Sequence, residues 1–216
     1  MTVITRTATL DDLAVILELE ENWPEETRAS AEKITARIEK FAQGFFLAEV
    51  DNVVVGDICC CPYHYRWGEL GSMQSWNAVT NSGYYHDCEN LNDFNSLYIV
   101  SGTVSKSYFG HGLLDNGLKY VEALARELGY EYVLAGAMIP GYSRYCDRHG
   151  EISAADYCFK TRDGILLDPL LAQYQRLGFS VPDRNHVVPG YFPDAKSRDF
   201  AAVVVKDLRR EPPPAT

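Results

Sequence analysis

The chain has 216 residues, 46% of them hydrophobic and 23% charged, which fits a globular protein with one large domain or two small ones. A formal net charge of −10 would repel a phosphate backbone, so we expect no nucleic-acid partner. No stretch approaches the roughly 20 apolar residues of a membrane span. Residues 1–13 lack the apolar core of a signal sequence, so we expect a cytoplasmic protein without membrane contact.

The first quarter of the chain predicts two helices and a β-hairpin. Thr9, followed three residues later by Asp12, is close to a capping box and predicts a helix in "LDDLAVILELE". A second helix is predicted from Ser30 to a stop at Gly44. "FFLAEV" and "VVVGDICCC", joined by Asp-Asn, predict the two strands of a hairpin.

The six cysteines carry no metal-binding pattern. They are Cys59, Cys60, Cys61, Cys88, Cys146 and Cys158. Three are consecutive in a predicted strand, where neighbouring side chains point to opposite faces and cannot bind one metal ion together. The sequence has no Cys-x-x-Cys pair. We therefore expect no metal site and interpret the thiols as buried and reduced.

The middle of the chain predicts a strand–turn–helix–strand segment. Residues 62–95 have no clear period and are interpreted as a binding loop or as short elements. The strand "SLYIVSGTV" leads through "SKSYFGHG" into a helix that ends before Gly129. "YEYVLAGAMI" is the next predicted strand.

The last third predicts one more helix and a final strand. Residues 140–167 are expected to form an irregular insertion. Asp168 and Pro169 begin a helix, and "DFAAVVVKDL" is the final strand. The order of elements predicts an α/β (α+β) fold with a mixed sheet. We expect a single domain over residues 1–208 and a Pro-rich tail or linker over residues 209–216.

Two glycines, Gly110 and Gly112, lie where a predicted strand turns into a predicted helix. Such a turn presents unpaired backbone N–H groups at the positive end of the helix dipole. A pyrophosphate can bind there without a lysine. Two glycines alone are not specific, so a tight turn without a ligand is the alternative interpretation.

The order of elements resembles the GNAT superfamily of acyl-CoA-dependent N-acyltransferases over about residues 3–207. The phosphate loop of that family has the pattern Q/R-x-x-G-x-G/A. The aligned stretch here is "FGHGLL", which keeps the central glycine as Gly112 but departs from the pattern at Phe109 and Leu114. The resemblance implies a mixed, mostly antiparallel central sheet, splayed between strands 4 and 5, with helices on both faces. It also implies binding of acetyl-CoA, malonyl-CoA or another short acyl-CoA, and no metal. The cofactor-binding residues that it implies are Gly102, Thr103, Val104, Ser105, Phe109, Gly110, His111, Gly112, Leu113 and Leu114.

The segment "LLAQYQRLGF" is similar to a family segment of the type A-x-x-x-Y-x-x-x-G-F, whose tyrosine protonates the leaving thiolate. The resemblance therefore implies that Tyr174 is a general acid. A phenol with a pKa near 10 can donate a proton to a thiolate with a pKa of about 8.5. Core packing is the alternative, because Leu170, Leu171 and Leu177 share a helix face with Tyr174.

A narrower resemblance is to a GNAT branch that is found fused to nitrilase-like hydrolases and in polyketide synthase loading modules. It is carried by "GAMIPGYSRY", "EISAADY", "LDPLLAQYQRLGF" and "PGYFPDAKSRDFAAVVV". The loading domains act on malonyl-CoA and a carrier-protein thiol, and they use a Thr and a His for decarboxylation. Thr103 matches the Thr. Ser143 stands where relatives often carry the His, and His149 follows in a predicted loop, so both are candidate catalytic residues.

Three functions follow from the resemblance. The first is direct transfer of acetyl or another short acyl group from a CoA thioester to a small-molecule amine or a thiol. The second is a loading-type domain that decarboxylates malonyl-CoA, S-acetylates a carrier-protein phosphopantetheine thiol, or does both. Ser101 stands where many relatives have a Glu base, which favours a thiol acceptor because a thiol loses its proton more easily than an amine. The third is a non-catalytic pseudo-GNAT that binds acyl-CoA. A homodimer is compatible with all three.

Overall fold

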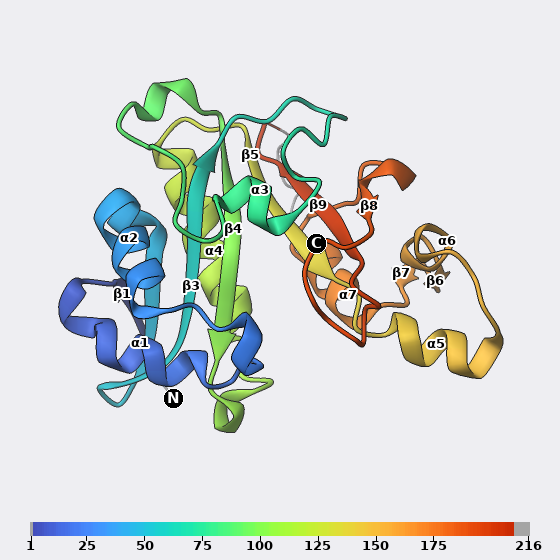
Figure 1. Cartoon of the computed structure of the whole chain (residues 1–216), viewed down its shortest axis with the longest axis horizontal. Coiled ribbons are helices and arrows are strands. Elements are labelled where there is room, and N and C mark those ends of the chain that lie inside the picture. Colours follow the sequence, from blue (N-terminus) through green and yellow to red (C-terminus); the bar gives the residue numbers. More distant parts are fainter. Residues whose placement is uncertain (1, 210–216) are drawn as a thin grey trace. The chain divides into compact units, whose positions relative to one another are not determined.

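The computed structural model describes residues 2–209. The chain divides into two compact units, Met1–His64 with Thr80–Glu131 and Tyr65–Val79 with Tyr132–Thr216. Figure 1 labels most of the helices and strands of the two units. The expected single domain over residues 1–208 stays a prediction, and the expected tail lies outside the described residues except for Arg209.

The first unit is built on an antiparallel sheet whose strands pair in chain order. These strands are β1 (Val3–Thr7), β2 (Phe45–Val50), β3 (Val53–Tyr63) and β4 (Ser96–Val104). The predicted hairpin is confirmed as β2 and β3. Its two turn residues, Asp51 and Asn52, have φ angles of 51° and 65°, the left-handed geometry of a tight two-residue hairpin turn.

The helices of the first unit begin and end largely where the sequence predicts. They are α1 (Leu13–Glu20), α2 (Ala31–Phe41) and α4 (Leu113–Glu127). Ser30 caps α2, since its hydroxyl oxygen accepts a hydrogen bond from the Lys33 amide. Gly129 follows the end of α4 with a φ of 73°, as expected of a glycine at that position. The first predicted helix starts as a 3-10 turn, Leu10–Asp12, before α1 begins.

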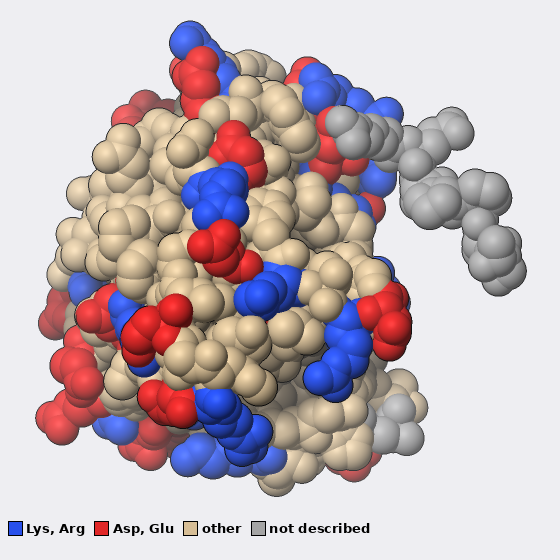
Figure 2. All heavy atoms as spheres, turned by 90° about the vertical axis from the view of Figure 1, so that its right-hand side faces the viewer, with Lys and Arg blue, Asp and Glu red and all other residues tan. Residues whose placement is uncertain are grey.

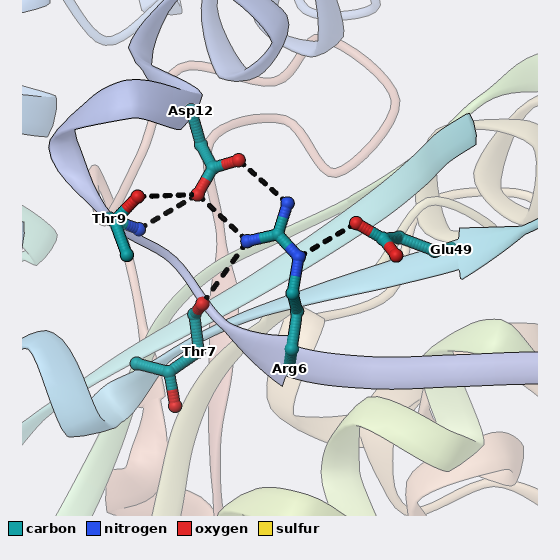
Figure 3. Close-up of polar contacts among 5 residues, drawn as sticks. All are labelled: Arg6, Thr7, Thr9, Asp12 and Glu49. Carbon is teal, nitrogen blue, oxygen red and sulfur yellow. Dashed lines mark hydrogen bonds and ion pairs between the residues drawn. The ribbon is translucent and has the colours of Figure 1, made fainter. Parts of the chain in front are cut away.

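Arg6 ties the start of the first helix to the edge of the sheet (Figure 3). Its guanidinium donates to both carboxylate oxygens of Asp12, at 2.8 and 2.7 Å, and to Glu49 on β2 at 2.7 Å. Asp12 also accepts hydrogen bonds from the amide and hydroxyl of Thr9, which confirms the predicted capping box. The Arg6 guanidinium, the largest cause, lowers the pKa of Asp12 to about 2.

The two faces of this sheet carry different side chains because neighbouring strand residues point in opposite directions. Ile58 pairs with Gly102, and a Cβ atom built on Gly102 would lie 3.3 Å from Leu114 of α4. Asp57 pairs with Thr103 on the opposite face. In Figure 1, α1 and α2 lie on one side of this sheet and α4 on the other.

The second unit has a smaller antiparallel sheet in the order β5 (Tyr132–Met138), β9 (Ala201–Asp207) and β8 (Val187–Val188). Gly136 on β5 is required for packing, because a Cβ atom at this position would lie 2.2 Å from the ring of Tyr191. Asp168 caps α7 (Pro169–Arg176) as predicted, with Oδ1 accepting from the Leu170 and Leu171 amides at 3.0 and 3.2 Å.

The prediction of an irregular insertion over residues 140–167 is wrong. This segment forms α5 (Tyr142–His149), α6 (Ala154–Cys158) and a small hairpin of β6 (Thr161–Arg162) and β7 (Ile165–Leu166). The helical period was hidden because α5 buries only Tyr142 and Cys146, while its remaining positions are mostly charged or polar. Residues 62–95 contain the short helix α3 (Trp76–Thr80) and a 3-10 turn, Leu91–Asp93, in agreement with the expectation of short elements.

All six cysteines are unpaired and buried, which confirms their interpretation as buried thiols. Within residues 2–209, no helix is long and apolar enough to cross a lipid bilayer. Figure 2 shows a face of the molecule on which acidic and basic side chains are interspersed among uncharged residues.

Candidate active site

The turn before α4 has the geometry of an anion cradle. Gly110 and Gly112 have φ angles of 81° and 74°, and Gly112 is the N-cap residue of α4. A Cβ atom at either glycine would meet no other atom within 4 Å, so the backbone here is open to a ligand. The Leu113 side chain is buried and that of Leu114 lies against β4, which leaves their backbone as the part available for binding. Unpaired amides at a helix N-terminus attract phosphate.

Two neighbours of these glycines have different surroundings. Phe109 is 63% exposed, and the His111 ring lies edge-on to Tyr108 at a centroid distance of 6.2 Å. Neither side chain has a charged partner among the contacts that the structure describes for it. A phosphate held here would therefore depend on backbone N–H groups.

A narrow cleft adjoins the start of α4 within the first unit. Its lining includes Phe46, Gly56, Ile58, Val104, Leu113 and Leu114. The cleft is narrow because Gly117 brings α4 close to β3, where a Cβ atom would lie 2.9 Å from Ile58. The lining is mostly apolar, but it also includes Asp57 and Thr103.

The backbone of β4 has N–H groups of two kinds. Ser105 donates to the Val55 carbonyl oxygen at 2.8 Å, and Thr103 donates to Oδ1 of Asp57 at 3.3 Å. Because successive strand amides point to opposite edges, the N–H groups of Gly102 and Val104 point to the other edge of β4. Gly102 and Val104 are therefore the better candidates among residues 102–105 for donating to a thioester oxygen.

Thr103 belongs to a buried polar cluster that sequence reasoning missed. The Trp23 indole Nε1 donates to the Thr103 hydroxyl oxygen at 2.9 Å. Asp57 is buried beside Thr103, and its second oxygen, Oδ2, has no hydrogen-bond partner among residues 2–209. Burial is the main cause that raises the pKa of Asp57 to about 7, and the nearby Glu20 carboxylate adds to it.

The remaining members of this cluster come from α1, from α2 and from the same two strands, β3 and β4. The Glu20 carboxylate on α1 accepts from the Ala29 amide at 2.6 Å, and burial raises the pKa of Glu20. Arg37 on α2 donates to the Gly83 carbonyl oxygen at 2.9 Å and to the Cys59 sulfur at 3.7 Å. The Cys59 sulfur also lies 3.2 Å from the Ser101 hydroxyl. Two signals for this cluster were present in the sequence. Arg37 falls on the apolar face of a predicted helix, and Asp57 interrupts an apolar strand.

Tyr174 lies in the core of the second unit. It is 7% exposed, and its ring packs edge-on against Phe179 at a centroid distance of 5.1 Å. Burial raises the pKa of Tyr174 to about 12, so the phenol stays protonated at neutral pH. Tyr174 is therefore buried in the core, as the packing alternative expects. The protonated phenol is also the form that a general acid needs, so its proposed catalytic role stays a prediction.

Ser143 and His149 lie on α5, so the expectation of a loop at His149 is wrong. The Ser143 amide donates to the Lys196 carbonyl oxygen at 3.0 Å. His149 is the last residue of the helix and packs against the ring of Tyr145 at a centroid distance of 4.6 Å. The two side chains project from different sides of α5, because they are six residues apart on a helix with 3.6 residues per turn.

No family model and no curated sequence matches this chain. The loading GNATL domain of CurA from Lyngbya majuscula is similar in structure, with a TM-score of 0.79 and 22% identity over 97% of this chain and 99% of that one. The GphF GNAT-like decarboxylase in complex with isobutyryl-CoA gives a TM-score of 0.75 and 21% identity over 95% of this chain and 100% of that one.

A third similar structure is yncA from Salmonella typhimurium, described as a putative acetyltransferase with its cofactor acetyl-CoA. Its TM-score is 0.58, with 15% identity over 100% of this chain and 99% of that one. These likenesses confirm the fold that the order of elements predicted. The chain has the GNAT fold, a mixed α/β fold with a mostly antiparallel sheet, and it is similar to GNAT domains over nearly its whole length.

Proposed function

We propose that the chain is an acyl-CoA-dependent GNAT acyltransferase that acts on a short acyl group. The GNAT fold over 97% of the chain carries this proposal. The open turn at Gly110 and Gly112 supports it, because the turn offers backbone donors and space where a pyrophosphate would lie. Residues 102–105 of β4 are proposed to pair with the pantetheine.

The proposed chemistry assigns one task to each group. Gly102 or Val104 donates its N–H to the thioester oxygen as negative charge develops there, an interaction commonly worth a few kcal/mol. Tyr174 gives its proton to the leaving thiolate. The acceptor attacks the thioester carbonyl directly, so no acyl-enzyme forms.

A second candidate is the loading-type function, in which malonyl-CoA is decarboxylated and the acyl group is passed to a carrier-protein thiol. It is favoured by the TM-scores of 0.79 and 0.75 for the loading domain and the decarboxylase, against 0.59 for an Ard1 structure from Thermoplasma volcanium. Ser101, whose hydroxyl faces Cys59 rather than a carboxylate base, supports a thiol acceptor.

Mass spectrometry of acyl-CoA after incubation with the protein distinguishes these candidates. Malonyl-CoA and acetyl-CoA are incubated separately, with and without a phosphopantetheinylated carrier protein and a panel of small amines. Protein-dependent conversion of malonyl-CoA to acetyl-CoA establishes the loading-type function. Acetyl transfer from acetyl-CoA with malonyl-CoA left intact establishes simple acyl transfer. If both thioesters bind in a calorimeter but neither is consumed, the catalytic proposal is wrong and the chain is an acyl-CoA-binding domain.

A further inference from the structure

The Thr103 hydroxyl is held from one side by a group that can only donate. An indole N–H has no acceptor capacity, so the Thr103 oxygen must use one of its two lone pairs to accept from Trp23. The hydroxyl proton therefore points away from Trp23. The direction that it takes depends on the other polar group beside it, which is the carboxyl of Asp57.

Asp57 is fixed against Thr103 at two points. Its Oδ1 accepts the Thr103 backbone N–H at 3.3 Å. The Thr103 side chain also interacts with the carboxyl, and both contacts favour the ionised form of Asp57. The Oδ2 atom, in contrast, is buried without a partner among residues 2–209. A buried carboxylate oxygen without a partner is costly, whereas a protonated Oδ2 is a hydrogen-bond donor.

The two protonation states of Asp57 give Thr103 opposite roles. When Asp57 is ionised, the carboxylate accepts the Thr103 hydroxyl proton. When Asp57 is protonated on Oδ2, the neutral carboxyl is a weaker acceptor, and its Oδ1 already accepts the Thr103 N–H. The hydroxyl proton is then no longer held strongly by Asp57 and points away from Trp23, which leaves it free for a bound ligand.

We propose that Asp57 is a positioning residue whose protonated form turns the Thr103 hydroxyl proton toward the bound acyl group. This inference rests on the proposed function for the presence of an acyl group at Thr103. Under it, Thr103 is the residue that touches the substrate and donates a hydrogen bond to it, while Asp57 acts only through Thr103.

The surroundings of Asp57 shift its titration to near neutral pH. Burial raises the pKa of this carboxyl to about 7, with Glu20 adding to the shift and Arg37 opposing it. The other titratable groups of the cluster are Cys59 and Tyr85, which interact with Arg37. Burial raises the pKa of Tyr85 well above its usual range, so Tyr85 stays neutral over that range.

The pH profile of Asp57→Asn tests the proposal. An amide in place of the carboxyl supplies an oxygen acceptor for the Thr103 N–H and a permanent donor in place of protonated Oδ2. With malonyl-CoA or acetyl-CoA as the probe, wild-type kcat should fall about tenfold for each pH unit above a midpoint near 7. The kcat of Asp57→Asn should lie within about twofold of the wild-type kcat at pH 6 and should be the same at pH 8.5 as at pH 6. The KM of the variant should differ little from that of the wild type at either pH.

Two further variants make the result specific. Asp51→Asn is the matched control, because Asp51 lies in the exposed turn of the same hairpin, and it should retain the wild-type profile. Thr103→Val should lower kcat by about tenfold or more and should remove the decrease of kcat above pH 7. A merely structural role for Asp57 would alter rates at every pH equally. The proposal is overturned if kcat of Asp57→Asn still falls above pH 7 as it does in the wild type.

A measurement without turnover separates this inference from the proposed function. The indole N–H resonance of Trp23, assigned with Trp23→Phe, is followed by NMR from pH 5 to 9. It should titrate with a midpoint near 7 in the wild type and stay constant in Asp57→Asn. If the wild type consumes neither thioester but shows this titration, the proposed function fails while the coupling of Asp57 to Thr103 stands. An identical titration in both proteins contradicts the coupling.

Discussion

Trp23 donates its indole N–H to the Thr103 hydroxyl at 2.9 Å, so the turn after α1 fixes a side chain on β4 that is 80 residues away in the chain. Trp23→Phe removes the donor and leaves the hydroxyl oriented by Asp57 alone. We expect kcat to fall by about tenfold with KM little changed, because orientation rather than binding is lost. Steady-state kinetics with the active thioester measures this.

The matched control for that variant is Trp67→Phe in the second unit. Trp67 is 44% exposed and packs against the rings of Tyr65 and Tyr132. It should retain wild-type kinetics. Equal losses of kcat in the two variants would show that the hydrogen bond to Thr103 is not the cause.

The buried Asp57 carboxyl should make stability depend on pH. Its folded pKa of about 7 lies above the unfolded value of about 3.9, so the native state binds the proton more tightly. The stability contributed by Asp57 is therefore complete below pH 4 and is lost as the pH rises toward 7 and slightly above. By linkage the loss is at most about 4 kcal/mol, because each pKa unit corresponds to about 1.4 kcal/mol.

Urea denaturation at pH 4 to 8 checks this dependence. Burial also raises the pKa of Glu20 and of Asp168, so the useful quantity is the difference between the wild type and Asp57→Asn. The free energy of unfolding of the variant should rise relative to that of the wild type between pH 4 and 8. Parallel curves would mean that Asp57 is not protonated in the native state near neutrality.

Much of the fold could be predicted because local chemistry decides it. Asp51 and Asn52 tolerate the left-handed conformation that a tight hairpin needs, and Asp168 before Pro169 marks a helix start. In α5, by contrast, only Tyr142 and Cys146 are buried, so tertiary packing stabilises a helix that has little apolar periodicity of its own.

The polar cluster around Thr103 could not be predicted as a cluster, since its members come from segments that meet only in the folded unit. The resemblance identified Thr103 but offered nothing about Trp23 or Asp57. Arg37 shares the buried face of α2 with Ile34, Ile38 and Phe41, a position that a charge occupies only at a cost. A charged residue inside an apolar pattern was the available signal. It indicates that Arg37 is buried, but it does not indicate which residues Arg37 contacts.

The turn before α4 gives a prediction with an internal control. Gly112 and Gly129, at the two ends of α4, have φ angles of 74° and 73°, and neither has an atom within 4 Å of an added Cβ. Substitution by alanine should therefore cost each a similar amount of stability, roughly 1 kcal/mol. Only Gly112→Ala should weaken acyl-CoA binding, by about tenfold, because only Gly112 lies at the proposed phosphate site. Calorimetry with CoA measures both variants, and equal loss of affinity would contradict a phosphate site at this turn.

A single substitution at Tyr174 can separate core packing from general-acid catalysis. Tyr174→Phe keeps the ring that packs against Phe179 and removes only the hydroxyl, for which the structure gives no hydrogen-bond partner within residues 2–209. We expect stability to stay within about 0.5 kcal/mol of the wild type. If Tyr174 protonates the leaving thiolate, transfer should slow by about tenfold or more. With an aryl thioester, whose thiolate leaves without a proton, the defect should shrink, because the acid is no longer needed. An unchanged rate with acetyl-CoA would show that Tyr174 serves only the core.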